Sequence, residues 1–513
     1  MQSLAHAFRA AVSQYAGRTA VIVDGNKLDY QALDAQSSQF AAALARLGVA
    51  KGDRIGLYCM NSPFFVIAYL GIIKAGATVV PINLLINTSE MAFILTDAGA
   101  KGLVFHAAFA EQATLLKKSV ESLAFSLSMG GDVEGARAWS EIVGTDEPSP
   151  AIEFNPQDDL AVILYTSGTT GKPKGAMLTH GNLLANVASV QEAMKWRPGE
   201  DTVLVVLPMF HAFAATVGLL TPLLYGCTIA PLPRFEPELV AKTIHETQAT
   251  LFLGVPSMFT VLLRLKPERV QWMESLRFCI SGGAALPVEV LKRFEAMFGK
   301  RIYEGDGPTE CGPVTCVNPV GGLSKPGTVG LPIPNVEMRI IGEQGVESLP
   351  IGEVGEIAVR GSNVMKGYWN LPEETAESFR ESWFLTGDMG TEDEDGYFSI
   401  VDRKKDLVIV NGMNVYPRMI EESLYRFAPI NEAAVVGEPN ELHGDIPVAY
   451  VSLISGSETT EADIRTYCRQ HLGSHQVPRK IHILAELPKN ATGKILKREL
   501  RKQGEIERGI KGL

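Results

Sequence analysis

The sequence predicts an α/β protein: a large N-terminal domain, made of two parallel-type α/β subdomains and a small β subdomain, followed by a small α+β C-terminal domain. Three observations support this prediction. Strand-like and helix-like segments alternate in the first part of the chain and again further on. Short strands with Gly-containing turns replace them after residue 327. Residues 405–513 then show a separate pattern of strands and helices, and 513 residues exceed what one hydrophobic core usually holds.

In the first α/β subdomain, apolar strands alternate with helices. Strands are expected at residues 53–59, 77–83 and 102–105. Ser62 and Pro63 open a helix that stops at Gly76, and Ser89 opens another that ends near Gly99. Nearly continuous apolar strands separated by helices are typical of a parallel sheet that is covered on both faces.

The same pattern returns later in the chain. Further strands are expected at residues 160–166, 250–256, 276–282 and 301–305. Residues 131–159 are rich in Asp, Glu, Pro and Gly, which indicates a surface connection between the two α/β subdomains. The β subdomain has short strands at residues 336–341, 355–361 and 396–401.

The C-terminal unit contains a helix around residues 419–426 and strands at 433–437 and 448–454. Its junction with the preceding part lies near residues 402–406. The predicted domains are therefore residues 1–404 and 405–513.

Composition narrows the class of protein. The net charge of −11 argues against sequence-independent nucleic-acid binding, which needs a basic surface, and favours small-molecule partners. Six scattered cysteines lack the spacing of a zinc site and are expected to be reduced and buried. No secretory signal is visible at the start of the chain, so a cytoplasmic location is expected.

One uncharged stretch, residues 202–233, is long enough to cross a bilayer. Pro208, His211, Pro222 and Gly226 interrupt it, so a buried strand, a loop and a buried helix explain it better than a membrane span. Peripheral membrane contact and a homodimer both stay open.

The clearest functional motif is YTSGTTGKPKG at residues 165–175, directly after a buried strand. Its glycines allow close approach of a phosphate, while its hydroxyls and lysines can donate charge-assisted hydrogen bonds. A Walker loop is excluded because Pro173 replaces the metal-binding hydroxyl, and a flexible linker rarely follows a buried strand. The candidate phosphate ligands are Thr166, Ser167, Gly168, Thr169, Thr170, Gly171 and Lys172.

With this motif and others in the same order, the sequence resembles the adenylate-forming superfamily of acyl-CoA synthetases, nonribosomal adenylation domains and firefly luciferases, and is most similar to fatty acyl-CoA ligases. The further motifs are SGGAALP at 281–287, DGPTE at 306–310, LTGD ending at 388, DRKKDLVIVNGMNVYP at 402–417 and PKNATGKILKREL at 488–500. The resemblance implies ATP, Mg2+ and coenzyme A, a carboxylic acid substrate, and a C-terminal domain that acts as a mobile lid.

The resemblance also assigns the nucleotide site. The implied ATP ligands beyond the phosphate loop are Gly283, Ala284, Ala285, Asp306, Gly307, Thr309, Asp388, Arg403 and Lys494. Glu310 supplies a hard oxygen for Mg2+, and Thr309 meets the α-phosphate. Asp388 accepts the ribose hydroxyls, with Arg403 beside it. Taken alone, Glu310 also fits a solvated loop acid, and Asp388 with Arg403 an exposed ion pair.

The implied catalytic residues are Lys494, Thr309, Glu310 and His211. Lys494 bridges the attacking carboxylate and the α-phosphate as charge builds up. His211 gates the acid or orients its carboxylate, although a hydrogen-bonded core histidine is the plainer alternative. The implied acyl and coenzyme A pocket contains His211, Val255, Gly282, Gly412 and Asn414, and the hinge is Lys405.

The sequence departs from the family at Asp306, where the family usually has a tyrosine. A carboxylate cannot stack on adenine, so recognition of the base is the least certain part of the implied site; Asp306 could instead accept a hydrogen bond from the amino group of the base.

The expected activity is formation of acyl-AMP and pyrophosphate from an acid and ATP, followed by formation of acyl-CoA. Residues 208–218 contain no acidic residue and no lysine, which favours an uncharged acyl group. Medium- or long-chain fatty acids are the first choice of substrate, on the expected apolar lining and the overall resemblance to fatty acyl-CoA ligases. Aryl acids are the second choice. A ligase that loads a carrier protein, a luciferase-like oxygenase and an inactive nucleotide-binding protein are the alternatives.

Overall fold

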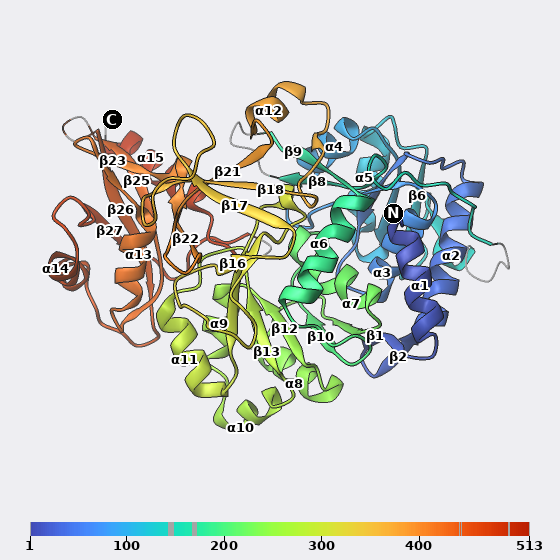
Figure 1. The fold of residues 1–513 in the computed structure, drawn as a ribbon, viewed down its shortest axis with the longest axis horizontal. Coiled ribbons are helices and arrows are strands. Elements are labelled where there is room, and N and C mark those ends of the chain that lie inside the picture. The colour runs from blue at the N-terminus through green and yellow to red at the C-terminus, as the bar shows by residue number, and fades with distance from the viewer. Residues whose placement is uncertain are drawn as a thin grey trace.

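Two large sheets form the body of the protein, and two smaller sheets follow along the chain (Figure 1). The computed structural model describes residues 2–141, 148–166, 172–440, 442, 444–490 and 493–511. The predicted α/β class, with a large N-terminal and a small C-terminal domain, is confirmed.

The first large sheet runs in the order β19-β9-β8-β4-β3-β5-β6-β7. Its strands are β3 (Arg54–Tyr58), β4 (Thr78–Pro81), β5 (Ala100–His106), β6 (Phe125–Met129), β7 (Arg137–Ala138), β8 (Leu160–Thr166), β9 (Lys174–Thr179) and β19 (Gly367–Tyr368). From β8 to β7 the neighbours are parallel, as predicted, whereas β9 and β19 add an antiparallel edge.

Two helices of this subdomain begin at residues whose side chains cap them. Helix α3 (Pro63–Lys74) starts where the Ser62 hydroxyl accepts the Phe65 amide at 3.3 Å, with proline in the first turn, as predicted. Helix α4 (Thr88–Asp97) begins earlier than predicted, because Asn87 rather than Ser89 caps it. The remaining helices here are α2 (Tyr30–Arg46) and α5 (Ala110–Ser119).

The second large sheet runs in the order β16-β15-β14-β13-β12-β10-β11-β1-β2. Its strands are β1 (Thr19–Val23), β2 (Asn26–Asp29), β10 (Thr202–Val205), β11 (Thr228–Pro231), β12 (Leu251–Gly254), β13 (Phe278–Ser281), β14 (Ile302–Asp306), β15 (Cys316–Val317) and β16 (Leu331–Pro332). The accompanying helices are α1 (Leu4–Tyr15), α6 (His180–Ala193), α7 (Thr221–Leu224), α8 (Pro237–Thr247), α9 (Pro256–Leu262), α10 (Pro267–Val270) and α11 (Val288–Phe298). One continuous apolar core includes residues of both large sheets and of the helices between them.

The uncharged stretch at residues 202–233 is folded into this second subdomain. It forms β10, a buried π-helix at Ala214–Leu220, α7 and β11, which confirms the expected buried strand and helix. None of the described helices is long and apolar enough to cross a membrane.

The two smaller sheets contain the rest of the chain. The antiparallel sheet consists of β17 (Val336–Ile341), β18 (Gly355–Gly361), β20 (Phe379–Arg380), β21 (Trp383–Glu392) and β22 (Phe398–Arg403), with α12 (Pro372–Glu377) nearby. The C-terminal sheet consists of β23 (Val408–Val410), β24 (Met413–Val415), β25 (Ile430–Asn440), β26 (Gly444–Leu453) and β27 (Lys480–Ile483), with α13 (Pro417–Tyr425), α14 (Glu461–His471) and α15 (Lys497–Lys511).

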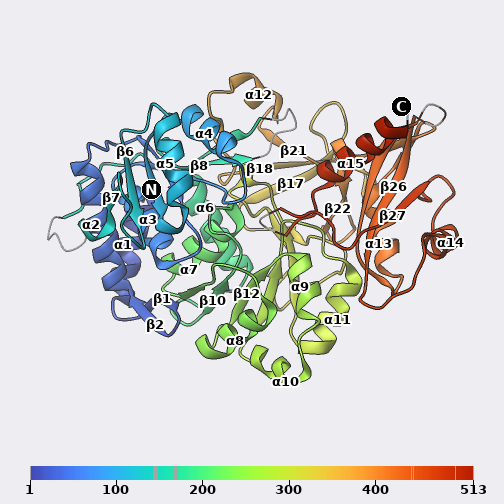
Figure 2. The ribbon, with the colours of Figure 1, turned by 180° about the vertical axis from the view of Figure 1, so that it is seen from behind.

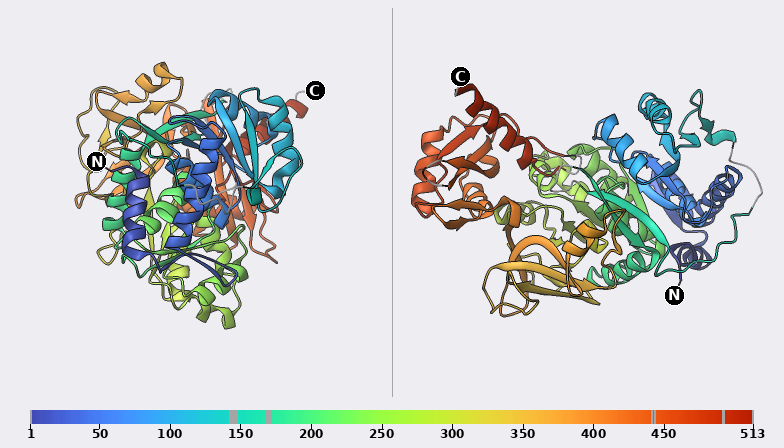
Figure 3. Two further views of the ribbon diagram at one scale, coloured as in Figure 1. Left: turned by 90° about the vertical axis from the view of Figure 1, so that its right-hand side faces the viewer. Right: turned by 90° about the horizontal axis from the view of Figure 1, so that it is seen from above.

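The C-terminal sheet and its helices lie at one end of the molecule (Figure 2), and from above they stand apart from the blue N-terminal subdomain (Figure 3). Strand β22 ends at Arg403, a short turn follows at Lys404–Asp406, and β23 begins in the other sheet. The domain boundary between residues 404 and 405 stays a prediction that agrees with this turn.

Candidate active site

The site is built on the carboxyl edge of the second large sheet. Strands β12, β13 and β14 run parallel and in register, with Gly254 opposite Ser281 and Ser281 opposite Glu304. Val255 and Gly282, which follow the first two strands, therefore leave the sheet side by side. This edge is where open parallel sheets bind ligands.

The predicted adenine loop leaves β13 at this edge and contains Gly283, Ala284 and Ala285. The next amide, that of Leu286, donates to Oε1 of Glu304 at 2.9 Å. Glu304 is only 2% exposed, and its Oε2 has no hydrogen-bond partner in the described structure. Burial raises the pKa of this carboxyl to about 7. Glu304 was not among the predicted site residues, although an acidic residue inside the apolar strand at residues 301–305 is visible in the sequence.

Asp306 ends β14 and its side chain is half-buried. Burial, together with the negative charge of Asp388, raises the pKa of the Asp306 carboxyl to about 6. The cations of Arg403 and Lys494 act in the opposite direction. The Asp306 carboxylate thus interacts electrostatically with Asp388, Arg403 and Lys494. Arg403 lies just before the C-terminal domain, and Lys494 lies within it.

The turn after Asp306 holds the next predicted residues. A Cβ atom on Gly307 would lie 1.7 Å from the carbonyl oxygen of Pro313, so only glycine fits there. A short helix at Thr309–Cys311 then presents Glu310, whose Oε1 accepts a hydrogen bond from the Tyr368 hydroxyl at 2.9 Å. Tyr368 was not among the predicted site residues, because no spacing in the sequence connects it with Glu310.

The two predicted ribose ligands face each other across β21 and β22. Asp388 lies directly opposite Arg403, and Oδ1 of Asp388 is 2.9 Å from Nε of Arg403. The Asp388 side chain is 9% exposed and that of Arg403 is 44% exposed. The pKa of Arg403 is raised chiefly by the Asp388 charge. The Asp388 carboxylate is thus held at the end of the antiparallel sheet, and the Arg403 guanidinium balances its charge.

Lys494 belongs to the C-terminal domain but reaches this same edge. Its turn is closed by the Lys494 amide donating to Oδ1 of Asn490 and by the Asn490 amide donating to the Lys494 carbonyl, both at 2.9 Å. The neighbouring Gly493 carbonyl accepts the Ser257 hydroxyl at 3.1 Å. The protein around the Lys494 amine lowers its pKa, and Arg403 adds to this effect.

His211 lies within range of Lys494. Burial lowers the pKa of the half-buried His211 ring to about 4, and the charge of Lys494 contributes in the same direction. The ring is therefore neutral at pH 7. Nδ1 accepts the Phe213 amide at 3.4 Å, so the neutral ring carries its proton on Nε2. A Cβ on Gly282 would lie 3.2 Å from the Phe213 ring, which places the His211 segment against the β13 edge.

The phosphate motif joins two antiparallel strands, with Thr166 opposite Lys174 in β8 and β9. Nζ of Lys172 lies 5.8 Å from the Phe93 ring centre, and Nζ of Lys174 lies 5.4 Å from that of Tyr368. The predicted ligands Ser167, Gly168, Thr169, Thr170 and Gly171 lie outside the described residues.

Two predicted pocket residues are not brought into the site. Gly412 and Asn414 are exposed on the β23–β24 hairpin, and a Cβ on Gly412 would meet no atom within 4 Å. Lys405 lies in the turn between β22 and β23, with its pKa lowered chiefly by burial and by Arg403.

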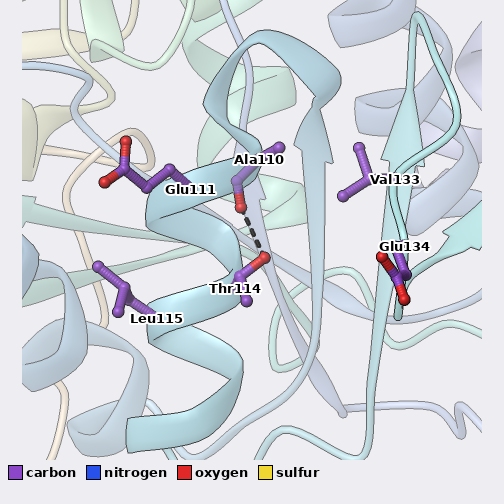
Figure 4. Close-up of a pocket in the computed structure, with 6 residues that line it drawn as sticks. All are labelled: Ala110, Glu111, Thr114, Leu115, Val133 and Glu134. Carbon is purple, nitrogen blue, oxygen red and sulfur yellow. Dashed lines mark hydrogen bonds between the residues drawn. The ribbon is translucent and has the colours of Figure 1, made fainter.

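A separate surface hollow lies beside α5 (Figure 4). It is lined by Ala110, Glu111, Thr114, Leu115, Val133 and Glu134. The Thr114 hydroxyl donates to the Ala110 carbonyl at 2.8 Å. The hollow contains none of the predicted site residues, and β6 and β7 beside it are at the opposite end of their sheet from the phosphate motif.

Among known proteins, this chain is 35% identical over 518 residues to a long-chain-fatty-acid–CoA ligase of Bacillus subtilis strain 168, covering 96% of this chain and 92% of the relative. It is also 35% identical over 496 residues to a feruloyl-CoA synthase of an Amycolatopsis species, covering 96% and 97%. The crystal structure of the anthranilate CoA ligase AuaEII with anthranoyl-AMP superposes with a TM-score of 0.90 at 27% identity, covering 98% of this chain and 97% of that one.

Two family models match this chain, one over most of the N-terminal part and one over the C-terminal part. Residues 8–369 match the AMP-binding enzyme family, and residues 419–494 match the AMP-binding enzyme C-terminal domain. The first match ends just after β19 and the second ends at Lys494. Together with the convergence of both domains on one sheet edge, they establish that the chain belongs to the AMP-binding enzyme family.

Proposed function

We propose that this protein is an AMP-forming carboxylic acid:CoA ligase that acts on fatty acids of medium or long chain. The observation that carries the proposal is the convergence of Lys494, from the C-terminal domain, with His211, Asp306, Asp388 and Arg403 at one sheet edge. Relatives named as long-chain-fatty-acid–CoA ligases support the reaction and the substrate class.

In the first step, the carboxylate of the acid attacks the α-phosphate of ATP, and acyl-AMP and pyrophosphate form. Lys494 lies between the carboxylate and the phosphate and stabilises the developing negative charge. Asp388 and Arg403 hold the ribose, and the phosphate motif with Lys172 holds the departing pyrophosphate.

Glu310 is the residue that fits Mg2+. Its carboxylate is half-buried beside the phosphate motif, and Tyr368 binds only one of its oxygens. Among the described residues no group of three metal-ligating side chains exists, which suits an ion held by one carboxylate and by the phosphates of ATP. When bound, Mg2+ neutralises charge on the phosphate oxygens.

In the second step, the thiol of coenzyme A attacks the acyl carbonyl and AMP leaves. We propose that the C-terminal domain first rotates about Lys405, which withdraws Lys494 and brings Gly412 and Asn414 to the site. The β23–β24 hairpin supports this second arrangement, because its Ile409 and Met413 side chains are 48% and 45% exposed. A rotated domain would cover this apolar surface.

The proposed acyl pocket lies between Val255, Gly282 and the His211 segment. These neighbours are apolar and mostly buried, which favours an uncharged acyl group. Aryl acids are the second candidate, because a feruloyl-CoA synthase is as similar to this chain as the fatty acid ligases are. The six cysteines are buried and free, which supports a reducing compartment such as the cytoplasm.

The test is pyrophosphate release with MgATP across a panel of aliphatic and aryl acids, with and without coenzyme A. We expect turnover to require coenzyme A and to be highest with aliphatic acids of medium or long chain. A maximum with aryl acids would move the substrate to the second candidate. Release without thioester formation would instead indicate a ligase that loads a carrier protein, or an oxygenase.

A further inference from the structure

A short segment, residues 365–369, braces two parts of the active site that are distant in sequence. Its central residues form β19, which pairs with β9 directly after the phosphate motif. The Lys366 amide donates to the Met177 carbonyl at 2.9 Å, and the Trp369 amide donates to the Gly175 carbonyl at 2.7 Å. We call residues 365–369 the bracing segment.

The same segment is bonded to the turn that carries Glu310. The Met365 amide donates to the Glu310 carbonyl at 2.7 Å, and the Tyr368 hydroxyl donates to Oε1 of the Glu310 carboxylate at 2.9 Å. Main-chain and side-chain bonds from one segment therefore fix both the backbone and the carboxylate of Glu310.

Tyr368 itself contacts both parts of the site. Nζ of Lys174, from the strand after the phosphate motif, lies 5.4 Å from the centre of its ring, within range of a cation–π interaction.

We propose that Tyr368 is a positioning residue for MgATP: its hydroxyl holds one oxygen of Glu310 so that the other is oriented toward the metal. The inference rests on the proposed role of Glu310 as the Mg2+ ligand. A carboxylate that lacks such a partner can rotate away from the metal, and loss of an outer partner of this kind typically weakens metal binding about 10- to 100-fold.

Tyr368→Phe tests the proposal, because phenylalanine keeps the ring beside Lys174 and removes only the donor. The matched control is Tyr397→Phe. Tyr397 also donates its hydroxyl, to the Leu323 carbonyl at 2.7 Å, and also lies beside a lysine, with Lys325 Nζ 4.4 Å from its ring centre. It has no contact with Glu310 among the described bonds.

The measurement is the calorimetric Kd of ATP in the presence of Mg2+ and in EDTA. We expect Mg2+ to lower the Kd of ATP by the same factor in the wild type and in Tyr397→Phe. In Tyr368→Phe this factor should be smaller by about tenfold or more. The Kd in EDTA should be the same in all three proteins, which also reports that the variants are folded. In a Glu310→Gln background, Tyr368→Phe should have no further effect.

Two results with Tyr368→Phe would overturn the proposal. One is the full Mg2+ effect in Tyr368→Phe, and the other is an equal loss of ATP affinity with and without Mg2+, which would mean that the hydroxyl only supports the fold. A wild type that binds ATP equally in both buffers would overturn the metal role of Glu310 together with this inference. If the proposed function is wrong, the result is distinguishable: the protein binds MgATP but forms no acyl-CoA.

Discussion

The buried carboxyl of Glu304 makes a quantitative prediction about stability. In the folded protein its pKa is raised to about 7 by burial, although Arg418 of α13 opposes this effect; Glu422 of α13 and Asp306 of its own strand act in the same direction as burial. The folded state therefore binds the proton more tightly than the unfolded state does. The contribution of the Glu304 carboxyl to the free energy of unfolding is fully present below pH 4.5 and is lost as the pH rises through 7.

The magnitude follows from the pKa difference. A rise of the pKa from its ordinary value of 4.5 to about 7 corresponds to roughly 3 kcal/mol, of which about 2 kcal/mol falls between pH 5.5 and 8. Glu304→Gln keeps an oxygen acceptor for the Leu286 amide but cannot ionise. We expect the variant to gain about 2 kcal/mol of unfolding free energy relative to the wild type between these two pH values.

The assay is urea unfolding of both proteins at pH 5.5 and pH 8, followed by circular dichroism. Only the change in the difference between variant and wild type matters, because other groups titrate equally in both. An identical difference at the two pH values would refute the reasoning, since it would mean that Glu304 is ionised in both the folded and the unfolded protein. A larger advantage for the variant at pH 5.5 would refute its sign.

Three further predictions concern the reaction. Lys494→Ala should slow acyl-AMP formation about a hundredfold or more and spare acyl transfer from synthetic acyl-AMP to coenzyme A; equal loss of both steps would contradict the proposed rotation. Ser257→Ala removes the hydrogen bond to the Gly493 carbonyl and should slow only acyl-AMP formation, about 3- to 10-fold, as measured by pyrophosphate exchange. Ser257→Thr should restore the rate, and the remote Ser275→Ala should leave it unchanged. His211→Ala should raise KM for the acid more than KM for ATP. Burial lowers the His211 pKa to about 4, so the ring does not titrate between pH 6 and 8. The pH profiles of acyl-AMP formation by the wild type and by His211→Ala should therefore have the same shape in this range.

The sequence predicted the features that depend on neighbours along the chain. The cap at Ser62, the parallel strands and the buried stretch at residues 202–233 follow from local patterns, and the structure confirms them. Residue roles at the site came from motif resemblance, and the structure brings Lys494, Asp388 and Asp306 together without testing what each does.

What the sequence could not predict depends on contacts between distant segments. Tyr368 and Glu310 are 58 residues apart, and Ser257 and Gly493 are 236 residues apart, so no periodicity or spacing links them. The same limit applies to Glu304, because the free energy of its carboxyl depends on how deeply β14 is buried.

The phosphate motif lies between two antiparallel strands, and this has a consequence for its electrostatics. Many phosphate sites lie at the first turn of a helix, where aligned peptide dipoles supply about half a positive charge. Helix α6 begins only after β9 is complete, at His180, so its dipole does not start at the motif. We therefore expect Lys172, together with bound Mg2+, to supply positive charge for the pyrophosphate, and the affinity of this protein for ATP to fall as salt is added.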